Sequence, residues 1–416
     1  MNRLKRGIAV LLCGAVLAGG IPLATAEDIP AIIAEQDSGE DIAELIAESE
    51  AEEWSQTVTA PTDSASLEIG GKGAILMEVS TGKILYERDA HKKLPIASVT
   101  KVMTLLLVME AIDAGQISLK DNVTCSAEAA SMGGSQIWLK ENEVMTVHEL
   151  VKAAAVVSAN DACAALAEHI SGSVEGFVAA MNARAAELGM KDTKFLDCCG
   201  LNDEAYSSAY DVAVMSRELI RHEEITAYTT IWMDTLRDGQ SQLVNTNKLV
   251  RFYQGATGLK TGTTAAAGHC LSATAERHGL SLVAVILGCD TTDERFGGAR
   301  KMLDYGFANY AVYTPQVDEN LFKPIPVRKG LAGQVQVRAD TPSPVLIKKG
   351  EEKAVTSEVS LSKDLEAPVY KGQTVGEVTV KLNGEKVASY PVRAAENVNR
   401  LTFFAAFCRL FQALVV

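Results

Sequence analysis

Three short polar motifs stand in one order along this 416-residue chain, and together they could perform acyl transfer. They are Ser98-Val99-Thr100-Lys101, Ser158-Ala159-Asn160 and Lys260-Thr261-Gly262. A serine hydroxyl carries almost no alkoxide at neutral pH, so it attacks an acyl carbon only when a neighbouring group removes its proton. The three segments could supply that nucleophile, a lysine base, a proton relay and a cation that holds a carboxylate.

Local context singles out one of three Ser-x-x-Lys matches. Ser80–Lys83 lies between two strand-like runs and predicts a glycine-containing hairpin turn. Ser360–Lys363 falls in a polar, strand-rich region. Ser98 instead precedes an apolar run, Val102–Ile112, that predicts a helix. Because residues three apart share a helix face, Lys101 can approach the Ser98 hydroxyl, and the helix N-terminus offers N–H groups to an oxyanion.

The other two motifs also allow purely structural interpretations. Ser158 and Asn160 follow a helical stretch, Val147–Val157, and both residue types are common helix caps. The run Gly258–Thr264 could be a simple turn before a strand, although its glycines permit close backbone approach to a ligand. The ordered triple is more specific than any of its parts, since it is the signature of penicillin-binding proteins and class A β-lactamases.

On these residues the chain resembles the low-molecular-mass penicillin-binding proteins that act as D-alanyl-D-alanine carboxypeptidases. The resemblance covers roughly Gly73–Val392 and includes further collinear runs: Ala74–Lys101, Gly133–Ile137, Ser158–Ala162, Glu187–Met190, Asn245–Leu249, Lys260–Thr264 and Met302–Phe307. It implies an α+β, penicillin-binding protein/β-lactamase-like transpeptidase fold. Such a fold has a five-stranded antiparallel sheet covered by helices, and a helical lobe that would contribute Ser158 and Asn160 to a site between the two.

The resemblance implies a catalytic role for each matching residue. Ser98 would be the nucleophile that forms the acyl-enzyme, and Lys101 would be the general base that accepts its proton. Ser158 would relay protons between Lys101 and the leaving amine. Asn160 would orient Lys101 and bind the peptide amide of the substrate.

The third motif would bind the substrate by the same resemblance. Lys260 and Thr261 would hold its C-terminal carboxylate, and the oxyanion hole would use the backbone N–H groups of Ser98 and Thr263. The substrate-binding residues are therefore expected to be Lys260, Thr261, Gly262 and Thr263.

Two positions depart from the family pattern. Some relatives carry His where this chain has Thr263, and some carry Arg where it has Thr246. Carboxylate recognition is therefore expected to differ in detail, with Arg251 as a candidate substitute.

The N-terminus predicts an export signal. Three basic residues precede an apolar run, Ile8–Ala18, and Ala24-Thr25-Ala26 supplies small residues for cleavage. The apolar run is too short to span a membrane, so residues 1–26 are interpreted as a secretory signal peptide. Cys13 lies inside the apolar run and not after a small residue, which argues against a lipoprotein.

The acidity of the chain is concentrated behind this signal. The formal net charge is −14, and residues 27–71 hold about 13 acidic side chains and no Lys or Arg. Residues 27–68 are predicted to form a disordered acidic spacer, with a short amphipathic helix over Ile42–Ile46 as the alternative. Because no basic patch supplies phosphate contacts, nucleic acid is not an expected partner.

The cysteines and histidines predict neither redox chemistry nor a metal site. Seven of the eight cysteines follow the signal peptide, and an odd number cannot pair completely. A disulfide between the adjacent Cys198 and Cys199 would be strained. Cys163 and Cys270 lie among small apolar residues, as buried free thiols do. The six histidines show no ligand spacing, so no metal and no cofactor are expected.

The C-terminal part has its own organisation. Beyond a catalytic domain predicted for residues 69–315, short β-rich runs and turns predict a small all-β domain over residues 319–394. Residues 397–416 are predicted to form an amphipathic, membrane-anchoring helix with an aromatic face. A helix over Leu401–Val416 would reach about 24 Å, short of a ~30 Å hydrocarbon core. It is expected to lie in a membrane interface, with packing on the protein as the alternative.

The function predicted from sequence is removal of the terminal D-alanine from peptidoglycan stem pentapeptides through an acyl-enzyme on Ser98, with covalent binding of β-lactam antibiotics. The enzyme is expected on the outer face of the cytoplasmic membrane, beside the cell wall and peripherally anchored. Two alternatives stay open: a β-lactamase, which must deacylate β-lactams quickly, and a non-catalytic β-lactam sensor or wall-binding protein, which would release no D-alanine.

Overall fold

The structure is a computed structural model that describes Asp63 and residues 66–407. The predicted signal peptide and nearly all of the predicted acidic spacer lie outside the described residues, as do residues 408–416. The described chain divides into two compact units. The first ends at Gly306, and the second comprises His278–Leu280 and the residues from Phe307 onward.

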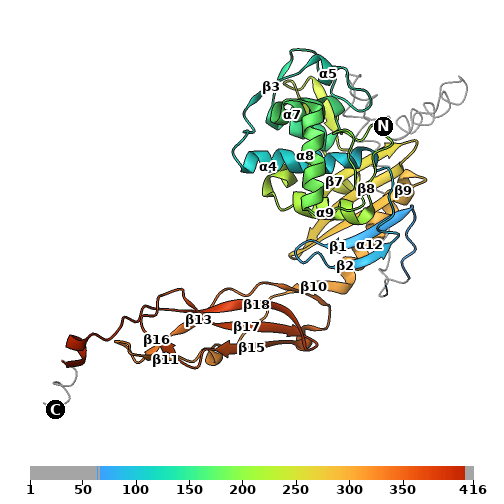
Figure 1. Ribbon diagram of the computed structural model, residues 1–416. Helices are drawn as coiled ribbons and strands as arrows, with labels where there is room; N and C mark the ends of the chain where they lie inside the picture. Colours follow the sequence, from blue (N-terminus) through green and yellow to red (C-terminus); the bar gives the residue numbers. More distant parts are fainter. Residues whose placement is uncertain (1–62, 64–65, 408–416) are drawn as a thin grey trace, which may run out of the picture. The chain divides into compact units, whose positions relative to one another are not determined.

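A five-stranded antiparallel sheet forms the base of the first unit, in the order β2-β1-β9-β8-β7 (Figure 1). Its strands are β1 (Gly73–Glu78), β2 (Ile84–Arg88), β7 (Ala256–Thr264), β8 (Gly268–Arg277) and β9 (Leu280–Cys289). The predicted turn at Ser80–Lys83 joins β1 to β2, with Gly82 at φ +73° and the Glu78 carboxylate accepting the N–H groups of Ser80 and Thr81. That Ser-x-x-Lys match is therefore a hairpin, as predicted.

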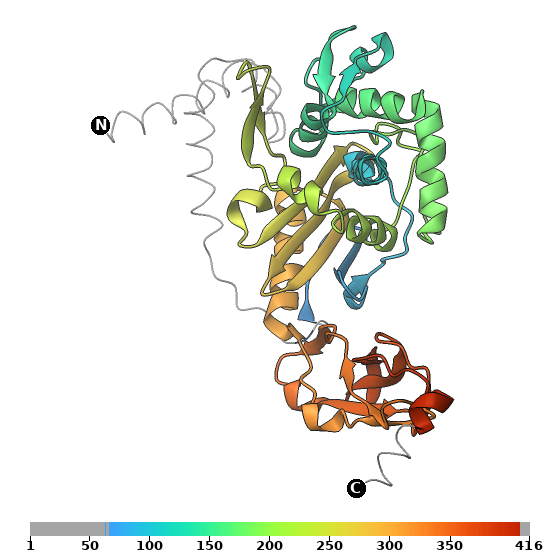
Figure 2. The same cartoon turned by 90° about the vertical axis from the view of Figure 1, so that its left-hand side faces the viewer.

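Both faces of this sheet are covered, which explains the continuous apolar sequence of β9. Val283, Val285 and Leu287 belong to the main core, which is shared with the helices on one face. The alternate residues Leu282 and Ile286 contact α12 (Thr292–Asn309) on the other face, where glycines in the helix allow close approach (Figure 2). A strand buried on both sides shows no polar alternation.

The helical lobe surrounds α4, which lies near the centre of the first unit (Figure 2). The short helix η2 (Ala97–Thr100) runs directly into α4 (Lys101–Asp113), one residue longer at each end than the helix predicted from sequence. The other helices of this unit are α5 (Ala127–Ala130), α6 (Val147–Val156), α7 (Asn160–Ser171), α8 (Val174–Glu187), α9 (Ala209–Leu219), η3 (Glu223–Ile225), α10 (Thr226–Thr229) and α11 (Leu249–Phe252). Two small hairpins complete it: β3 (Asn122–Thr124) with β4 (Val144–Thr146), and β5 (Met233–Leu236) with β6 (Ser241–Val244).

The second unit is all-β apart from short turns of 3-10 helix and residues 403–407, as the sequence predicted (Figure 1). Its sheets have the orders β10-β14, β12-β11-β16 and β13-β18-β17-β15. The strands are β10 (Tyr310–Tyr313), β11 (Ile325–Arg328), β12 (Gln334–Val335), β13 (Val337–Ala339), β14 (Val345–Lys348), β15 (Val355–Leu361), β16 (Leu365–Glu366), β17 (Thr374–Leu382) and β18 (Glu385–Ala394). Asn383 and Gly384 form the predicted turn between β17 and β18, both with positive φ.

Two boundaries differ from those expected. Because β10 pairs with β14, Tyr310–Tyr313 belong to the second unit and not to a catalytic domain that runs to residue 315. The predicted C-terminal helix begins later than residue 397, since Val398 and Arg400 make β-bridges to Val369 and Gly330. Both pairings join residues far apart in sequence, so no local pattern reveals them.

Helix begins at Phe403 in the described part of the C-terminal segment. Three aromatic side chains are exposed there, Phe403 by 88%, Phe404 by 75% and Phe407 by 57%. Within the described residues, no helix is both long enough and apolar enough to cross a membrane.

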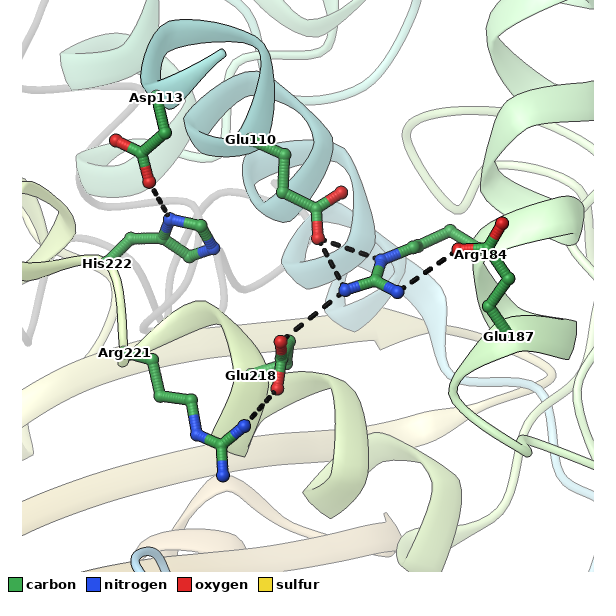
Figure 3. A network of polar contacts seen from close by, with 7 residues as sticks. All are labelled: Glu110, Asp113, Arg184, Glu187, Glu218, Arg221 and His222. Carbon is green, nitrogen blue, oxygen red and sulfur yellow. Dashed lines mark hydrogen bonds and ion pairs between the residues drawn. The ribbon is translucent and has the colours of Figure 1, made fainter. Parts of the chain in front are cut away.

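A polar network ties α4, α8 and α9 together behind the core (Figure 3). Arg184 of α8 reaches Glu110 of α4 at 2.7 Å and Glu218 of α9 at 3.4 Å. These carboxylates hold the pKa of the Arg184 guanidinium above its usual value, despite partial burial. Arg221 extends the network through Glu218, and His222 and Asp113 form a separate pair nearby. A single guanidinium thus links three helices.

We predict that Arg184→Met lowers the free energy of unfolding by about 1–2 kcal/mol, because it leaves two partly buried carboxylates without their shared cation. Chemical denaturation at neutral pH measures the change. Arg221→Met is the matched control, since its side chain is 50% exposed and an exposed ion pair contributes only about 0.5 kcal/mol. Equal losses in the two variants would contradict a linking role for Arg184.

Candidate active site

The first motif places a serine hydroxyl beside a buried lysine amine. Ser98 lies in η2 and is partly exposed, whereas Lys101 opens α4 and is 0% exposed. The distance from Lys101 Nζ to Ser98 Oγ is 3.0 Å, as the three-residue spacing predicted. Lys101 Nζ also lies 2.8 Å from the backbone oxygen of Cys199, a contact that no sequence motif marks. A buried amine is thereby held between two oxygen atoms.

The second motif lies where the chain passes from α6 to α7, and Asn160 is the first residue of α7. Ser158 adopts a positive φ of 63°, is 4% exposed, and its Oγ has no hydrogen-bond partner among the described residues. The N-cap of α7 is Ala159, without a side-chain hydrogen bond, so neither Ser158 nor Asn160 caps the helix. Buried polar atoms without a protein partner are uncommon and characteristic of functional sites.

Asn160 and its neighbour Asp161 hold a loop that precedes the second motif. Asn160 Nδ2 donates to the Gly133 oxygen at 2.6 Å, while Asn160 Oδ1 has no partner within the described residues. The Asp161 carboxylate accepts the N–H groups of Ile137 and Leu139. Burial raises the pKa of Asp161, although these N–H groups and that of Ala162 oppose the effect. The glycine-rich loop is thereby fixed against the start of α7.

The third motif lies on β7, not in a turn before a strand. Lys260 is 1% exposed and Thr261 is 6% exposed. Lys260 Nζ donates to the Thr261 oxygen at 2.9 Å. The Thr261 and Thr246 hydroxyls lie 2.7 Å apart, so the threonine at this departure from the family pattern contacts the motif itself.

Gly262 allows β7 to approach the segment that carries Ser98. A Cβ at this position would lie 2.7 Å from the Ile96 oxygen and 2.9 Å from the nitrogen atoms of Ser98 and Val99. Real Cβ atoms do not come this close to backbone atoms. The glycine therefore brings the backbone of β7 against the segment that carries Ser98.

Contacts between neighbours bring the three motifs together from separate segments. Cys199 joins the first two motifs. Its backbone oxygen accepts a hydrogen bond from Lys101, and its Sγ lies 3.4 Å from the backbone oxygen of Asn160. Thr246 joins the second and third, because its N–H donates to the Val156 oxygen at the end of α6. Figure 1 shows α4, α7 and β7 meeting in one region of the first unit.

Arg295 is a residue of this site that the sequence did not predict. It projects from α12, is 1% exposed, and its NH1 lies 3.2 Å from Thr263 Oγ1 and 3.4 Å from the Gly262 oxygen. The candidate substitute Arg251 is instead exposed on α11. Arg295 follows the third motif by more than thirty residues and belongs to no recognisable pattern, so only the packing of α12 on the sheet reveals it.

The cysteines of the described chain are buried and free. Cys163 and Cys270 are 0% exposed, as predicted. Burial raises the pKa of the Cys270 thiol, and that of Cys125, to about 11, so both are protonated at neutral pH and poor nucleophiles. Among the described residues, no cluster of His, Cys, Asp and Glu could hold a metal ion.

The antiparallel sheet, the helical lobe and a serine paired with a buried lysine define a protein of the penicillin-binding protein and β-lactamase-like class. The chain belongs to the D-alanyl-D-alanine carboxypeptidase family, whose model matches residues 56–291. The model of the penicillin-binding protein 5 C-terminal domain matches residues 312–400. The predicted family is therefore confirmed.

Two relatives show how far the similarity extends. D-alanyl-D-alanine carboxypeptidase DacF of Bacillus subtilis is 43% identical over 80% of this chain and 87% of its own length. D-alanyl-D-alanine carboxypeptidase DacC of Escherichia coli is 34% identical over 84% of this chain and 88% of its own length.

Solved structures confirm the predicted fold. Penicillin-binding protein 5 from Haemophilus influenzae superposes with a TM-score of 0.67 at 32% identity, covering 83% of this chain and all of that one. PBP3 from Streptococcus pneumoniae, described as a peptidoglycan synthesis regulatory factor, gives a TM-score of 0.68 at 30% identity. It covers 80% of this chain and all of that one.

We predict that Gly262→Ala lowers the rate of acylation by penicillin by ~10²-fold or more, because the added methyl group pushes β7 away from Ser98. Mass spectrometry of the protein against time measures the rate. Gly297→Ala is the matched control: its Cβ would meet open space in the interior of α12, so it should keep the rate and stabilise the helix by up to about 1 kcal/mol. A Gly262→Ala protein that acylates at the wild-type rate would contradict the close approach.

Proposed function

We propose that this chain removes the terminal D-alanine from peptidoglycan stem pentapeptides by acyl transfer to Ser98. The observation that supports it most directly is the 3.0 Å separation between Ser98 Oγ and the buried amine of Lys101. Membership of the carboxypeptidase family supplies the substrate class.

In the acylation step, Lys101 acts as the general base. Its neutral amine takes the Ser98 proton while Oγ attacks the carbonyl carbon of the penultimate D-alanine. The former carbonyl oxygen becomes negatively charged and accepts hydrogen bonds from the backbone N–H groups of Ser98 and Thr263. Gly262 allows the segments that carry these two groups to lie close together. Burial of Lys101 keeps its Nζ away from bulk water and beside Ser98 Oγ during this step.

The second motif completes the proton transfers. When the tetrahedral intermediate collapses, the leaving D-alanine amine needs a proton, which Ser158 passes on from Lys101. The buried Ser158 hydroxyl has no other partner among the described residues, so it can both donate and accept. Asn160 offers its Oδ1 to the substrate amide, since its Nδ2 is already bound to Gly133. Water then attacks the ester by the reverse path and releases the shortened peptide.

The carboxylate of the terminal D-alanine is held by residues of β7 and by Arg295 of α12. Lys260 is a buried side chain of this strand, Arg295 reaches the strand from α12, and Thr261 and Thr263 present hydroxyl groups along it. A carboxylate in such a place gains charge-assisted hydrogen bonds that compensate for its desolvation. Arg295 thereby strengthens carboxylate binding where relatives use His or Arg at the positions of Thr263 and Thr246.

The same chemistry explains covalent β-lactam binding. A β-lactam presents a strained amide with a carboxylate nearby, so it acylates Ser98 in the same way. The acyl-enzyme that results is hydrolysed slowly. A related protein with 33% sequence identity, penicillin-binding protein D2 from Listeria monocytogenes, has been solved in an ampicillin-bound form.

We predict that the protein releases D-alanine from a pentapeptide ending in D-Ala-D-Ala, and that Ser98→Ala abolishes the release. Chromatography of the products measures D-alanine, and Ser80→Ala is the matched control in the excluded Ser-x-x-Lys hairpin. A folded Ser98→Ala protein that still releases D-alanine would refute the mechanism. Rapid turnover of penicillin would instead indicate a β-lactamase, and acylation without D-alanine release would indicate a sensor.

We propose that the enzyme acts outside the cytoplasm, exported by a signal peptide at residues 1–26. In this arrangement an acidic spacer at 27–68 precedes a catalytic domain, and an all-β domain separates that domain from a C-terminal amphipathic anchor. The family acts on the cell wall, which supports the location. The exposed Phe403, Phe404 and Phe407 support the anchor, because aromatic side chains partition favourably into a membrane interface.

We predict that a variant truncated after Leu401 no longer sediments with anionic lipid vesicles but retains full activity on a soluble pentapeptide. The exposed phenylalanines are lost, while all strands of both compact units and the bridges at Val398 and Arg400 are kept. The triple variant Phe403→Ser, Phe404→Ser and Phe407→Ser should behave in the same way. Undiminished vesicle binding by both variants would show that the anchor lies elsewhere.

A further inference from the structure

Asp197 organises the turn that supplies the second partner of Lys101. Its carboxylate accepts hydrogen bonds from three backbone N–H groups in the residues that follow. Oδ1 lies 2.6 Å from the Cys199 nitrogen and also accepts from Gly200, while Oδ2 lies 2.7 Å from the Asn202 nitrogen. Charge-assisted bonds of this kind are short and strong. One side chain thus fixes the backbone path from residue 197 to residue 202.

The same turn is bound to α4 through two consecutive carbonyl groups. Thr104 Oγ1 donates to the Cys198 oxygen at 2.6 Å, and Lys101 Nζ donates to the Cys199 oxygen at 2.8 Å. Thr104 follows Lys101 by one helical turn, so both side chains emerge from the same face. All four residues are 0% exposed. The threonine hydroxyl therefore sets the register of the turn along the helix.

The turn also contacts the segment just before the nucleophile. Gly200 has a φ of +82°, and a Cβ there would lie 1.9 Å from the Ala97 oxygen. The backbone that carries the Cys199 oxygen is therefore packed against the backbone that carries Ser98. A displacement of the turn would therefore move the Cys199 oxygen relative to Ser98.

We propose that Asp197 and Thr104 are positioning residues for acylation: they hold the Cys199 carbonyl against Lys101 and so aim the amine lone pair at Ser98. The inference rests on the proposed role of Lys101 as the general base. A neutral amine has two N–H groups and one lone pair. When one N–H is bound to a fixed carbonyl, rotation about the Cε–Nζ bond is restricted. The lone pair then faces Oγ for a larger share of the time, which lowers the entropic cost of proton transfer.

This assignment gives the adjacent cysteines a role that their thiols did not suggest. Their side chains are buried, with the two Sγ atoms 3.4 Å apart. Their backbone oxygens, by contrast, are the groups that meet α4. Asp197 acts through Cys199, and Thr104 acts through Cys198.

Stopped-flow acylation with a fluorescent penicillin tests the proposal, because it separates the dissociation constant of the non-covalent complex from the acylation rate constant. We expect Asp197→Ala to lower the rate constant by ~10²-fold and Thr104→Val by about tenfold, with the dissociation constant unchanged. Asp197→Asn and Thr104→Ser keep an acceptor and a donor respectively, so both should recover most of the rate. Asp121→Ala is the matched control, since Asp121 accepts a backbone N–H in an exposed turn of its own and should have no effect.

The outcomes separate positioning from mere stability. If both Asp197→Ala and Thr104→Val keep the acylation rate constant within twofold of wild type, the proposal is overturned. It is also overturned if the rate falls only in proportion to a loss of folded protein, as monitored by thermal melting. Should Asp197→Ala fail to fold, the pair Thr104→Val and Thr104→Ser decides. A wild-type protein that is not acylated at Ser98 refutes the proposed function itself, and this inference with it.

Discussion

The buried amine of Lys101 is the group on which the rest of the site depends. It is removed from water and touches both the Ser98 hydroxyl and the Cys199 carbonyl. A buried nitrogen needs hydrogen-bond partners, and here the serine hydroxyl and the carbonyl group supply them. The surrounding elements can be understood as the means of keeping this one group dry and correctly directed.

Close contacts between backbone segments help to bury Lys101 and to fix its surroundings. Gly262 brings β7 against the segment before α4, and Gly200 brings the 197–202 turn against the same segment from another direction. A Cβ at either position would collide with backbone atoms, so these segments would have to move apart. The active site is therefore assembled mainly from main-chain groups, with the functional side chains projecting from rigid elements around it.

Carboxylates that accept several backbone N–H groups organise the loops of the site. Asp161 holds the loop at residues 133–139, and Asp197 holds the turn at 197–202, in both cases by accepting several backbone N–H groups. None of these hydrogen bonds involves Ser98. They fix the backbone groups that contact Asn160 and Lys101, so a single side chain makes each irregular segment rigid.

The sequence alone predicted the chemistry and, through a family resemblance, the fold class. The spacing of Ser98 and Lys101, the apolar helix behind them and the order of the three motifs indicated acyl transfer, because these are local or collinear properties. The resemblance that the motifs carry implied the fold. The short β-rich runs and the Asn383-Gly384 turn likewise predicted the all-β unit from local preference.

Only the tertiary structure decided what completes the site and where the units divide. The Cys199 carbonyl, the Arg295 guanidinium and the pairing of β10 with β14 each join segments separated by tens of residues. No single-sequence pattern encodes such contacts, because they follow from the packing of whole elements and not from the preferences of neighbours. The sequence thus predicts Ser98 as the nucleophile, whereas the carbonyl group that Lys101 contacts is set by the fold.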